Sequence, residues 1–241
     1  MSLRPNSFVR GLAAVSLLAA ASAAAADILV VRSIGPSSAS YPPGKRLPDN
    51  ARLTLQAADQ LMVLDGRGTR MLRGPGTFTA GTAPRQVASA QPALQRRARI
   101  GAVRGVEGGL LRPPSLWHAD IGQDETFCLA DPAALTLWRR DTNVALPLTV
   151  TRESDGASGR AVFEAGASTA AWPADLIPAD GARYRLSRPD GTHPTRITFR
   201  ALGRTPSALQ DLASSLIAAG CTSQLDLLVE TVRAPDRAPR G

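Results

Sequence analysis

A histidine and a carboxylate lie close together in Leu116-Trp-His-Ala-Asp120. His118 and Asp120, with a serine such as Ser115, are the residue types of a hydrolase that activates a serine hydroxyl through a histidine base. That chemistry depends on geometry, and no Gly-x-Ser-x-Gly turn surrounds any serine of the chain. The other interpretation is a histidine at the edge of a β-domain. We therefore predict no catalytic residue and keep a hydrolase using His118 and Asp120 as an alternative.

A small group of acidic residues overlaps this stretch and could bind a cation. Asp120, Asp124 and Glu125 could line a calcium loop together with Asp155 and Asp180. Their spacing matches neither an EF-hand nor a calcium-binding repeat, and turns and strand ends also use such residues. We therefore predict neither a metal site nor a cofactor.

Two cysteines, Cys128 and Cys221, are the only ones in the chain. In an oxidising compartment such a pair is first interpreted as a disulfide. Two free buried thiols are the alternative, and a redox pair would usually be close in sequence. Neither cysteine has another cysteine or a histidine at the spacing of a zinc site. We predict a Cys128–Cys221 disulfide.

The first residues have the pattern of a secretory signal peptide. Arg4 and Arg10 precede a short, alanine-rich apolar run, and small residues end at Ala26. The run is too short to favour a permanent membrane anchor. We expect residues 1–26 to be removed near Ala26, leaving a periplasmic or secreted protein with no integral membrane segment.

The chain is basic, with a formal net charge of +8, but the charge pattern does not indicate a nucleic-acid partner. Lys45 is the only lysine, and the arginines are scattered singly among alanine, proline and glycine. Aromatic residues make up only 4% of the chain, so stacking platforms for bases are scarce. We expect no nucleic-acid binding.

The best-defined local pattern lies in residues 61–78. An apolar run leads to Asp65-Gly66, the return segment follows Gly68, and Gly74-Pro75-Gly76 forces a second turn. The glycine pairs are no phosphate loops, because neither opens a helix and neither has the lysine of such a site. The pattern predicts two hairpin strands and a third short strand.

With its lead-in Pro43-Gly-Lys-Arg-Leu47, this stretch resembles the FecR-like domain of bacterial envelope proteins. The resemblance covers residues 27–80 and depends on turn residues and apolar alternation; any small β-meander with these turns is the alternative. It implies a sensing or scaffolding module on the envelope side. FecR proteins of iron signalling also carry an anti-sigma region and a transmembrane helix. The sequence predicts neither, so we do not expect a sigma-factor role.

Residues 81–114 change in composition and are predicted to be a linker, rich in Pro, Gln and Arg. Arg96, Arg97 and Arg99 form its basic cluster. This cluster and the hairpin arginines Arg67 and Arg70 are our predicted partner contacts, with a solvated charge run as the alternative.

Residues 115–203 carry seven short segments of strand composition, separated by turns such as Asp190-Gly191. The alternation of apolar and polar residues is clearest around Tyr184 and Phe199, and it predicts a sheet with one buried and one exposed face. The spacing predicts a β-sandwich, and Trp172-Pro173 with Asp180-Gly-Ala-Arg-Tyr184 resembles immunoglobulin-like accessory domains. The predicted strands are 126–130, 134–138, 146–151, 160–164, 169–172, 182–186 and 196–202.

The end of the chain, residues 204–233, predicts two helices packed on the sandwich. Thr205 and Pro206 fit the start of the first, Gly220 its end, and Ser223 the start of the second. Residues 234–241 are predicted to be a disordered tail.

The expected fold class is therefore mainly β: a FecR-like β-domain, an immunoglobulin-like β-sandwich and a helical pair. We expect an exported, non-enzymatic protein-interaction, sensing or scaffold module of the bacterial periplasm, whose partner is an envelope or periplasmic protein. The alternatives are the envelope hydrolase using His118 and Asp120, and a cell-wall or glycan-binding protein.

Overall fold

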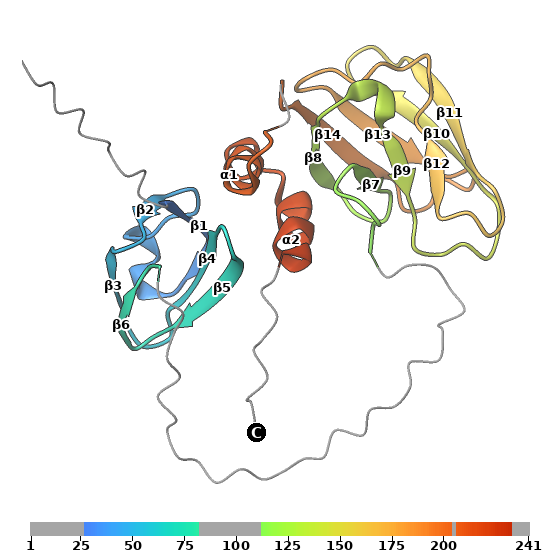
Figure 1. The fold of residues 1–241 in the computed structure, drawn as a ribbon. Helices are drawn as coiled ribbons and strands as arrows, with labels where there is room; N and C mark the ends of the chain where they lie inside the picture. Colours follow the sequence, from blue (N-terminus) through green and yellow to red (C-terminus); the bar gives the residue numbers. More distant parts are fainter. Residues whose placement is uncertain (1–26, 82–111, 204–205, 233–241) are drawn as a thin grey trace, which may run out of the picture.

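The computed structural model describes residues 27–81, 112–203 and 206–232, and in these ranges the chain is mainly β with two C-terminal helices (Figure 1). This confirms the predicted fold class. The predicted signal peptide, nearly all of the predicted linker and the predicted tail lie outside the described residues. Within the described ranges, no helix is both long and apolar enough to cross a bilayer.

The N-terminal module contains two small sheets. The hairpin predicted from Asp65-Gly66 is confirmed, with Asp65 opposite Gly68 in an antiparallel pair. One sheet has the strand order β2-β1-β4-β5, and the other pairs β3 with β6. The elements are β1 (Asp27–Ile34), η1 (Pro36–Ala39), β2 (Arg46–Pro48), β3 (Arg52–Leu55), β4 (Gln60–Asp65), β5 (Gly68–Arg73) and β6 (Gly76–Thr79).

Strand β1 is buried on both faces, which explains its uninterrupted run of apolar residues. Successive side chains of a strand point to opposite faces of the sheet. Ile28 and Val30 belong to the apolar cluster that includes β3, whereas Leu29 and Val31 belong to a second cluster, which includes Leu216 of the C-terminal region. The second face of this sheet is thus covered by residues from the far end of the chain.

The second module is a β-sandwich, and all seven predicted strands are present. A five-stranded sheet has the order β11-β10-β13-β14-β8, and a three-stranded sheet the order β12-β9-β7. The pairs β14–β8 and β7–β9 are parallel, which the sequence did not indicate. The elements are β7 (His118–Asp120), β8 (Glu125–Leu129), η2 (Pro132–Ala134), β9 (Thr136–Trp138), β10 (Leu146–Arg152), β11 (Ser158–Phe163), β12 (Thr169–Ala171), β13 (Arg183–Ser187) and β14 (Thr195–Ala201).

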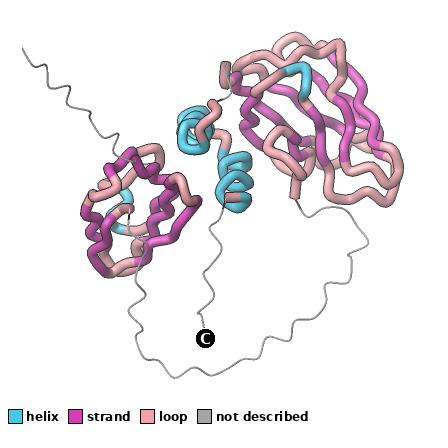
Figure 2. The backbone as a smooth tube through the Cα atoms, in the orientation of Figure 1, coloured by secondary structure: helices cyan, strands magenta, loops and turns pink. Residues whose placement is uncertain are grey.

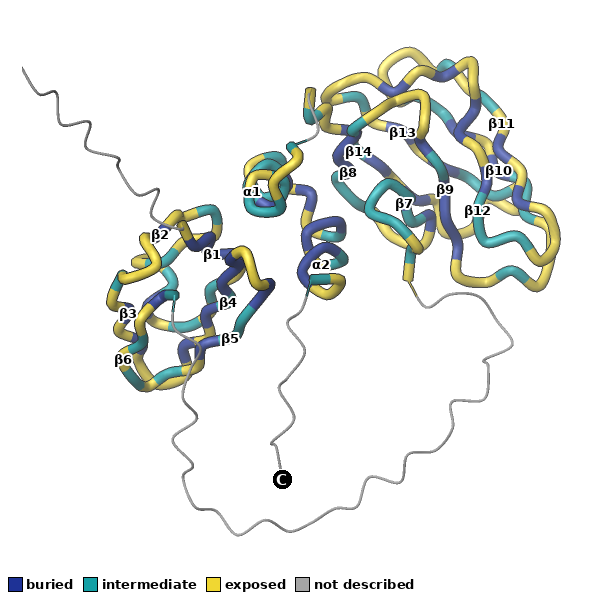
Figure 3. The backbone as a smooth tube through the Cα atoms, viewed as in Figure 1, coloured by how far each residue is buried: buried dark blue, intermediate teal, exposed yellow. Residues whose placement is uncertain are grey.

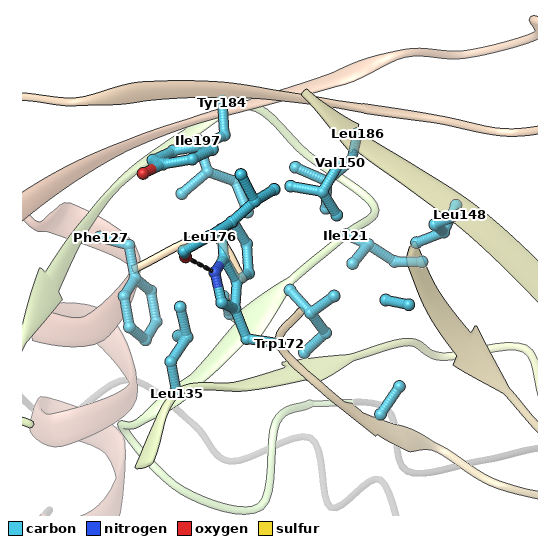
Figure 4. Packing of buried hydrophobic residues seen from close by; sticks show 14 of the residues in the cluster. Ile121, Phe127, Leu135, Leu148, Val150, Trp172, Leu176, Tyr184, Leu186 and Ile197 are labelled. Atoms are coloured by element: carbon cyan, nitrogen blue, oxygen red, sulfur yellow. Dashed lines mark hydrogen bonds between the residues drawn. The ribbon is translucent and has the colours of Figure 1, made fainter. Parts of the chain in front are cut away.

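The sandwich core is formed by its own strands and connecting loops and centres on aromatic side chains (Figure 4). The Trp172 ring lies edge-to-face against Tyr184 and Phe199, with ring centroids 5.1 Å apart in both pairs. Its indole N–H donates to the carbonyl oxygen of Leu176 at 2.5 Å. Each such aromatic pair contributes about 0.5–1.5 kcal/mol beyond area burial, so these rings are a main source of the sandwich's stability.

The two predicted helices are present as α1 (Leu209–Ala219) and α2 (Thr222–Thr231). Gly220 ends α1 in the left-handed conformation, as predicted. The predicted starts are wrong: α1 is preceded by an extended Ala208 rather than beginning at Pro206, and Cys221 rather than Ser223 occupies the cap position of α2. Thr205 lies outside the described residues. Neither helix start is closed by a side-chain cap hydrogen bond.

The helices form a layer between the two β-modules, as Figures 1 and 2 show. Helix α1 contacts β1, and α2 contacts both β5 and β8. The helices were predicted on the sandwich, and they also cover the N-terminal sheet. Figure 3 marks the buried residues of α2 within this layer in dark blue. The predicted Cys128–Cys221 disulfide is confirmed, and it joins β8 to the start of α2 across 93 residues.

Polar contacts also attach the helices to the N-terminal module. Salt bridges join Arg32 to Asp226 and Arg46 to Asp211. The Thr69 amide N–H donates to the carbonyl oxygen of Val232 at 3.2 Å, so the end of α2 meets the edge strand β5. The disulfide therefore attaches the helical layer to the sandwich, and apolar contacts, salt bridges and a hydrogen bond attach it to the N-terminal sheet.

Candidate functional site

A cavity of about 230 Å³ lies where β7, β8 and α2 meet. Its polar and charged lining is Arg112, His118, Asp120, Gln123, Glu125, Ser223, Gln224, Asp226 and Glu230. His118 and Asp120, the residues of the alternative hydrolase, thus line the same cavity as Ser223 and Gln224 of the helical layer. This cavity is the candidate functional site.

Strand β7 presents two of the polar side chains to the cavity. His118 and Asp120 are two residues apart, so they point to the same side of the strand, and the buried Ala119 points to the other. Glu125 begins β8, and its carboxylate accepts a hydrogen bond of 3.1 Å from the Asp120 backbone N–H. The Glu125 side chain therefore bridges from the five-stranded sheet to the edge of the three-stranded sheet.

The Glu125 carboxyl is the most perturbed acid of the site. Burial raises the pKa of Glu125 to about 7, and the nearby Asp120 carboxylate acts in the same direction. Hydrogen bonds to the Asp120 backbone and to Ser223 lower it, but by less. Burial also raises the pKa of Asp120. A carboxyl that titrates near neutral pH can donate or accept a proton there, which an exposed glutamate cannot.

His118 is kept mainly neutral by the same surroundings. Burial lowers its pKa below the ordinary value, although a backbone hydrogen bond to Ser115 opposes the shift. Its Nδ1 atom is buried and has no hydrogen-bond partner in the structure. His118 therefore offers the cavity a neutral imidazole with one unsatisfied ring nitrogen.

His118, Asp120 and Ser115, considered for the alternative hydrolase, are not joined in a hydrogen-bonded relay among the described residues. The Ser115 hydroxyl accepts a hydrogen bond from the Trp117 backbone at 3.3 Å, and Asp120 accepts one from Gly122 at 2.8 Å. In the part of the chain that the structure describes, no hydrogen bond joins His118 to Asp120. The hydroxyl that does line the cavity belongs to Ser223, which receives a 3.3 Å hydrogen bond from Gln123.

Gln224 fixes the helical wall of the cavity to the sandwich. Its side-chain oxygen accepts from the Cys128 backbone N–H at 2.6 Å, and its amide group donates to the Cys128 carbonyl at 3.0 Å. The amide group also donates to the Leu116 carbonyl at 2.9 Å. This buried side chain thus hydrogen-bonds the backbone N–H and carbonyl of Cys128, as a residue of a neighbouring strand would, at the edge of β8 next to the disulfide.

Sequence reasoning missed the importance of Glu125, Ser223 and Gln224. Glu125 was noted only as one of several acids, although an acid directly before the apolar run of β8 is a signal of partial burial. The predicted disulfide puts the start of α2 against β8, but no local pattern indicates that Ser223 and Gln224 line a cavity with His118 and Asp120 of β7.

The predicted partner contacts divide into three groups. Arg67 is exposed at the turn between β4 and β5, as the prediction assumed. Arg70 is not: its side chain is 14% exposed and pairs with Asp65 at 2.8 Å, besides donating to the carbonyl oxygen of Ala80. Arg96, Arg97 and Arg99 lie outside the described residues.

The acidic residues considered for calcium do not gather. Asp155 pairs with Arg152, Asp124 accepts from the backbone of Arg196, and Asp180 accepts from the backbone of Ala201. Over residues 27–81, 112–203 and 206–232, no group of three or more His, Cys, Asp or Glu side chains could hold a metal ion.

Comparison of the chain with protein-family models, with curated proteins and with solved structures gives no match. The interpretation of the site therefore depends on its geometry alone.

Proposed function

We propose that the protein is an exported, non-enzymatic interaction scaffold of the bacterial envelope. A FecR-like module and an immunoglobulin-like module are held in one arrangement by the helical layer and bind an envelope or periplasmic protein. The observation that carries the proposal is that α1 and α2 contact both modules. Two β-modules linked only by a flexible segment would bind independently, whereas this layer lets one partner contact both.

Export is supported by the confirmed disulfide, because such bonds persist in oxidising compartments and are rare in the cytosol. The predicted signal peptide points the same way. The periplasm is the compartment that fits both features, with the secreted state as the alternative.

Exposed loops at the ends of the two modules supply the proposed contact surface. Arg67 occupies the hairpin turn of the N-terminal module, and Val144 and Ile177 occupy loops of the sandwich at 66% and 72% exposure. Loops carried on a rigid β-scaffold are the usual position of binding residues. A large apolar side chain held in solvent is stabilised when a partner covers it.

Site-specific photocrosslinking in the envelope of the native bacterium tests the proposal. A photoreactive amino acid replaces Arg67 in one variant and Arg52, an exposed residue of β3, in the matched control. We expect a reproducible protein adduct through position 67 and a weaker or absent one through position 52. No adduct at position 67, with the protein free and monomeric, would contradict the proposal.

A second candidate function, a hydrolase at the cavity, is favoured by one observation. Glu125 titrates near neutral pH beside a neutral His118, which is the pairing of proton donor and acceptor that acid–base catalysis needs. Ester, phosphate and glycoside substrates with a chromogenic leaving group would be compared on the native protein, Glu125→Gln and His118→Ala. Turnover that both substitutions abolish would establish the hydrolase in place of the scaffold.

A further inference from the structure

The outer face of the five-stranded sheet carries an unusual set of exposed arginines. On three strands, arginines alternate with residues of the sandwich core such as Tyr184 and Phe199, so all of them point away from that core. We call this surface the arginine face. Its members are Arg160 of β11, Arg183 and Arg185 of β13, and Arg196 and Arg200 of β14.

The strand order and register spread these charges over one face of the sheet, from β11 to β14. Arg185 lies directly opposite Arg196, and Arg183 lies opposite Thr198. Opposite positions are about 5 Å apart, and alternate residues along a strand are roughly 7 Å apart. Like charges in directly opposite positions destabilise a sheet. Glu153 offsets part of this repulsion, and the positive charge that remains points to a role in binding.

Little negative charge neutralises the arginine face. Glu153 lies 3.3 Å from Nε of Arg196 and 3.7 Å from Nε of Arg183. Among the residues that the structure describes, no ion pair or hydrogen bond engages the side chains of Arg160, Arg185 or Arg200. At the rim, Asp180 accepts a hydrogen bond from the Ala201 backbone. The face is thus strongly positive, with three guanidinium groups fully available.

We propose that the arginine face binds the phosphate-bearing surface of an anionic lipid membrane. Its other outward residues include Thr149, Thr151 and Thr198, whose hydroxyls, like guanidinium groups, are phosphate ligands. No aromatic residue occupies an outward position of β10, β11, β13 or β14, so the face offers no stacking platform for bases. An array spread over four adjacent strands can engage all its charges at once only on an extended anionic surface.

This inference goes beyond the proposed scaffold function, because it supplies a membrane surface as well as a protein partner. It also orients the molecule. With the arginine face on the membrane, the opposite, three-stranded side of the sandwich would face away from the lipid.

Vesicle co-sedimentation of the mature protein, recovered from the periplasm of an expressing bacterium, tests the inference. Vesicles of phosphatidylcholine alone are compared with vesicles that also contain phosphatidylglycerol, at low and high salt. We expect binding only to the anionic vesicles and a loss of binding in high salt, because surface electrostatics is screened.

A matched pair of variants separates the arginine face from net charge. The test variant carries Arg185→Thr and Arg200→Thr, and the control carries Arg52→Thr and Arg73→Thr, two exposed arginines of the N-terminal module. Each basic residue at an anionic membrane strengthens binding roughly fivefold, so the test variant is expected to bind roughly 25-fold more weakly. The control is expected to bind like the native protein.

Three results would overturn the inference: equal losses in the two variants, equal binding to neutral vesicles, or binding to an acidic protein or to DNA without binding to anionic vesicles. Unchanged tryptophan fluorescence of both variants shows that the sandwich is folded, because all three tryptophans lie in that part of the chain. The assay contains no partner protein, so its outcome is independent of the crosslinking result.

Discussion

Strands β1 and β13 show two different relations between sequence and environment. In β13, exposed arginines alternate with core residues, because one face meets the sandwich core and the other meets solvent. In β1, Ile28 to Val31 are all apolar and all buried, because each face of the N-terminal sheet is covered. The sandwich core is formed by the sandwich's own strands and loops, whereas the N-terminal sheet needs the helices from the end of the chain.

This difference assigns the helices a structural role in the N-terminal module that their position in the sequence does not suggest. If it is correct, damage to the helical layer should loosen the distant N-terminal sheet, and damage to the sandwich core should not. The predictions below test this asymmetry, beginning with the largest expected effect.

Leu216→Ala should destabilise the N-terminal module. Leu216 is 1% exposed in the cluster that contains Leu29 and Val31, and truncating a buried leucine costs about 2–5 kcal/mol. Hydrogen exchange of the β1 and β4 amides, followed by mass spectrometry, should accelerate. Leu186→Ala in the sandwich core is the matched control: it should lower the unfolding midpoint seen by tryptophan fluorescence and leave β1 exchange unchanged. If the two substitutions accelerate hydrogen exchange of the β1 amides equally, the proposed difference between the two modules is wrong.

Replacing both cysteines, Cys128→Ala with Cys221→Ala, should lower the free energy of unfolding by about 2–5 kcal/mol. The disulfide joins α2 to β8, so urea unfolding followed by tryptophan fluorescence should shift to lower denaturant. The β1 amides should also exchange faster, since the helices that cover them lose their attachment. A variant whose urea midpoint matches that of the native protein would show that Gln224 and the apolar contacts suffice.

Glu125→Gln should have the smallest effect, visible as a change in pH dependence. Burial raises the pKa of Glu125 from its ordinary value of 4.5 to about 7, so the folded state holds the proton more tightly than the unfolded state does. The proton on Glu125 therefore stabilises the folded state. This stabilisation is fully present below pH 4.5 and is lost as the pH rises through 7. The variant should lose that decline and be more stable than the native protein above pH 7. Thermal unfolding from pH 4 to 8 checks this, and parallel curves for the two proteins would refute the raised pKa.

Local patterns were sufficient to predict most strands. The alternation around Tyr184 and Phe199 and the Asp-Gly turns gave the sandwich strands, and Asp65-Gly66 gave the N-terminal hairpin. The apolar run in β1 is typical of a strand buried on both faces, but no neighbouring residue indicates which segment covers its second face. That information lies in the leucines of α1 and α2, far along the chain.

The candidate site was less predictable for the same reason. His118 and Asp120 were singled out by residue type, yet the relay they suggested is not formed. The perturbed acid is Glu125, whose pKa depends on burial between β7, β8 and α2. Docking of α2 on the sandwich was predicted together with the disulfide, but the parallel pairing of β7 with β9, which completes that environment, leaves no pattern in the local sequence.

Methyl–methyl nuclear Overhauser effects in the native protein test the central claim, that the C-terminal helices cover the N-terminal sheet, most directly. With Ile, Leu and Val methyl groups labelled, we expect cross-peaks from Leu29 or Val31 of β1 to leucines of the helices, Leu216 or Leu228. Cross-peaks of Ile28 and Val30 to Leu53 serve as the internal reference for the other face. If the reference peaks appear and every β1–helix peak is missing, the helical layer does not join the two modules and the account is wrong.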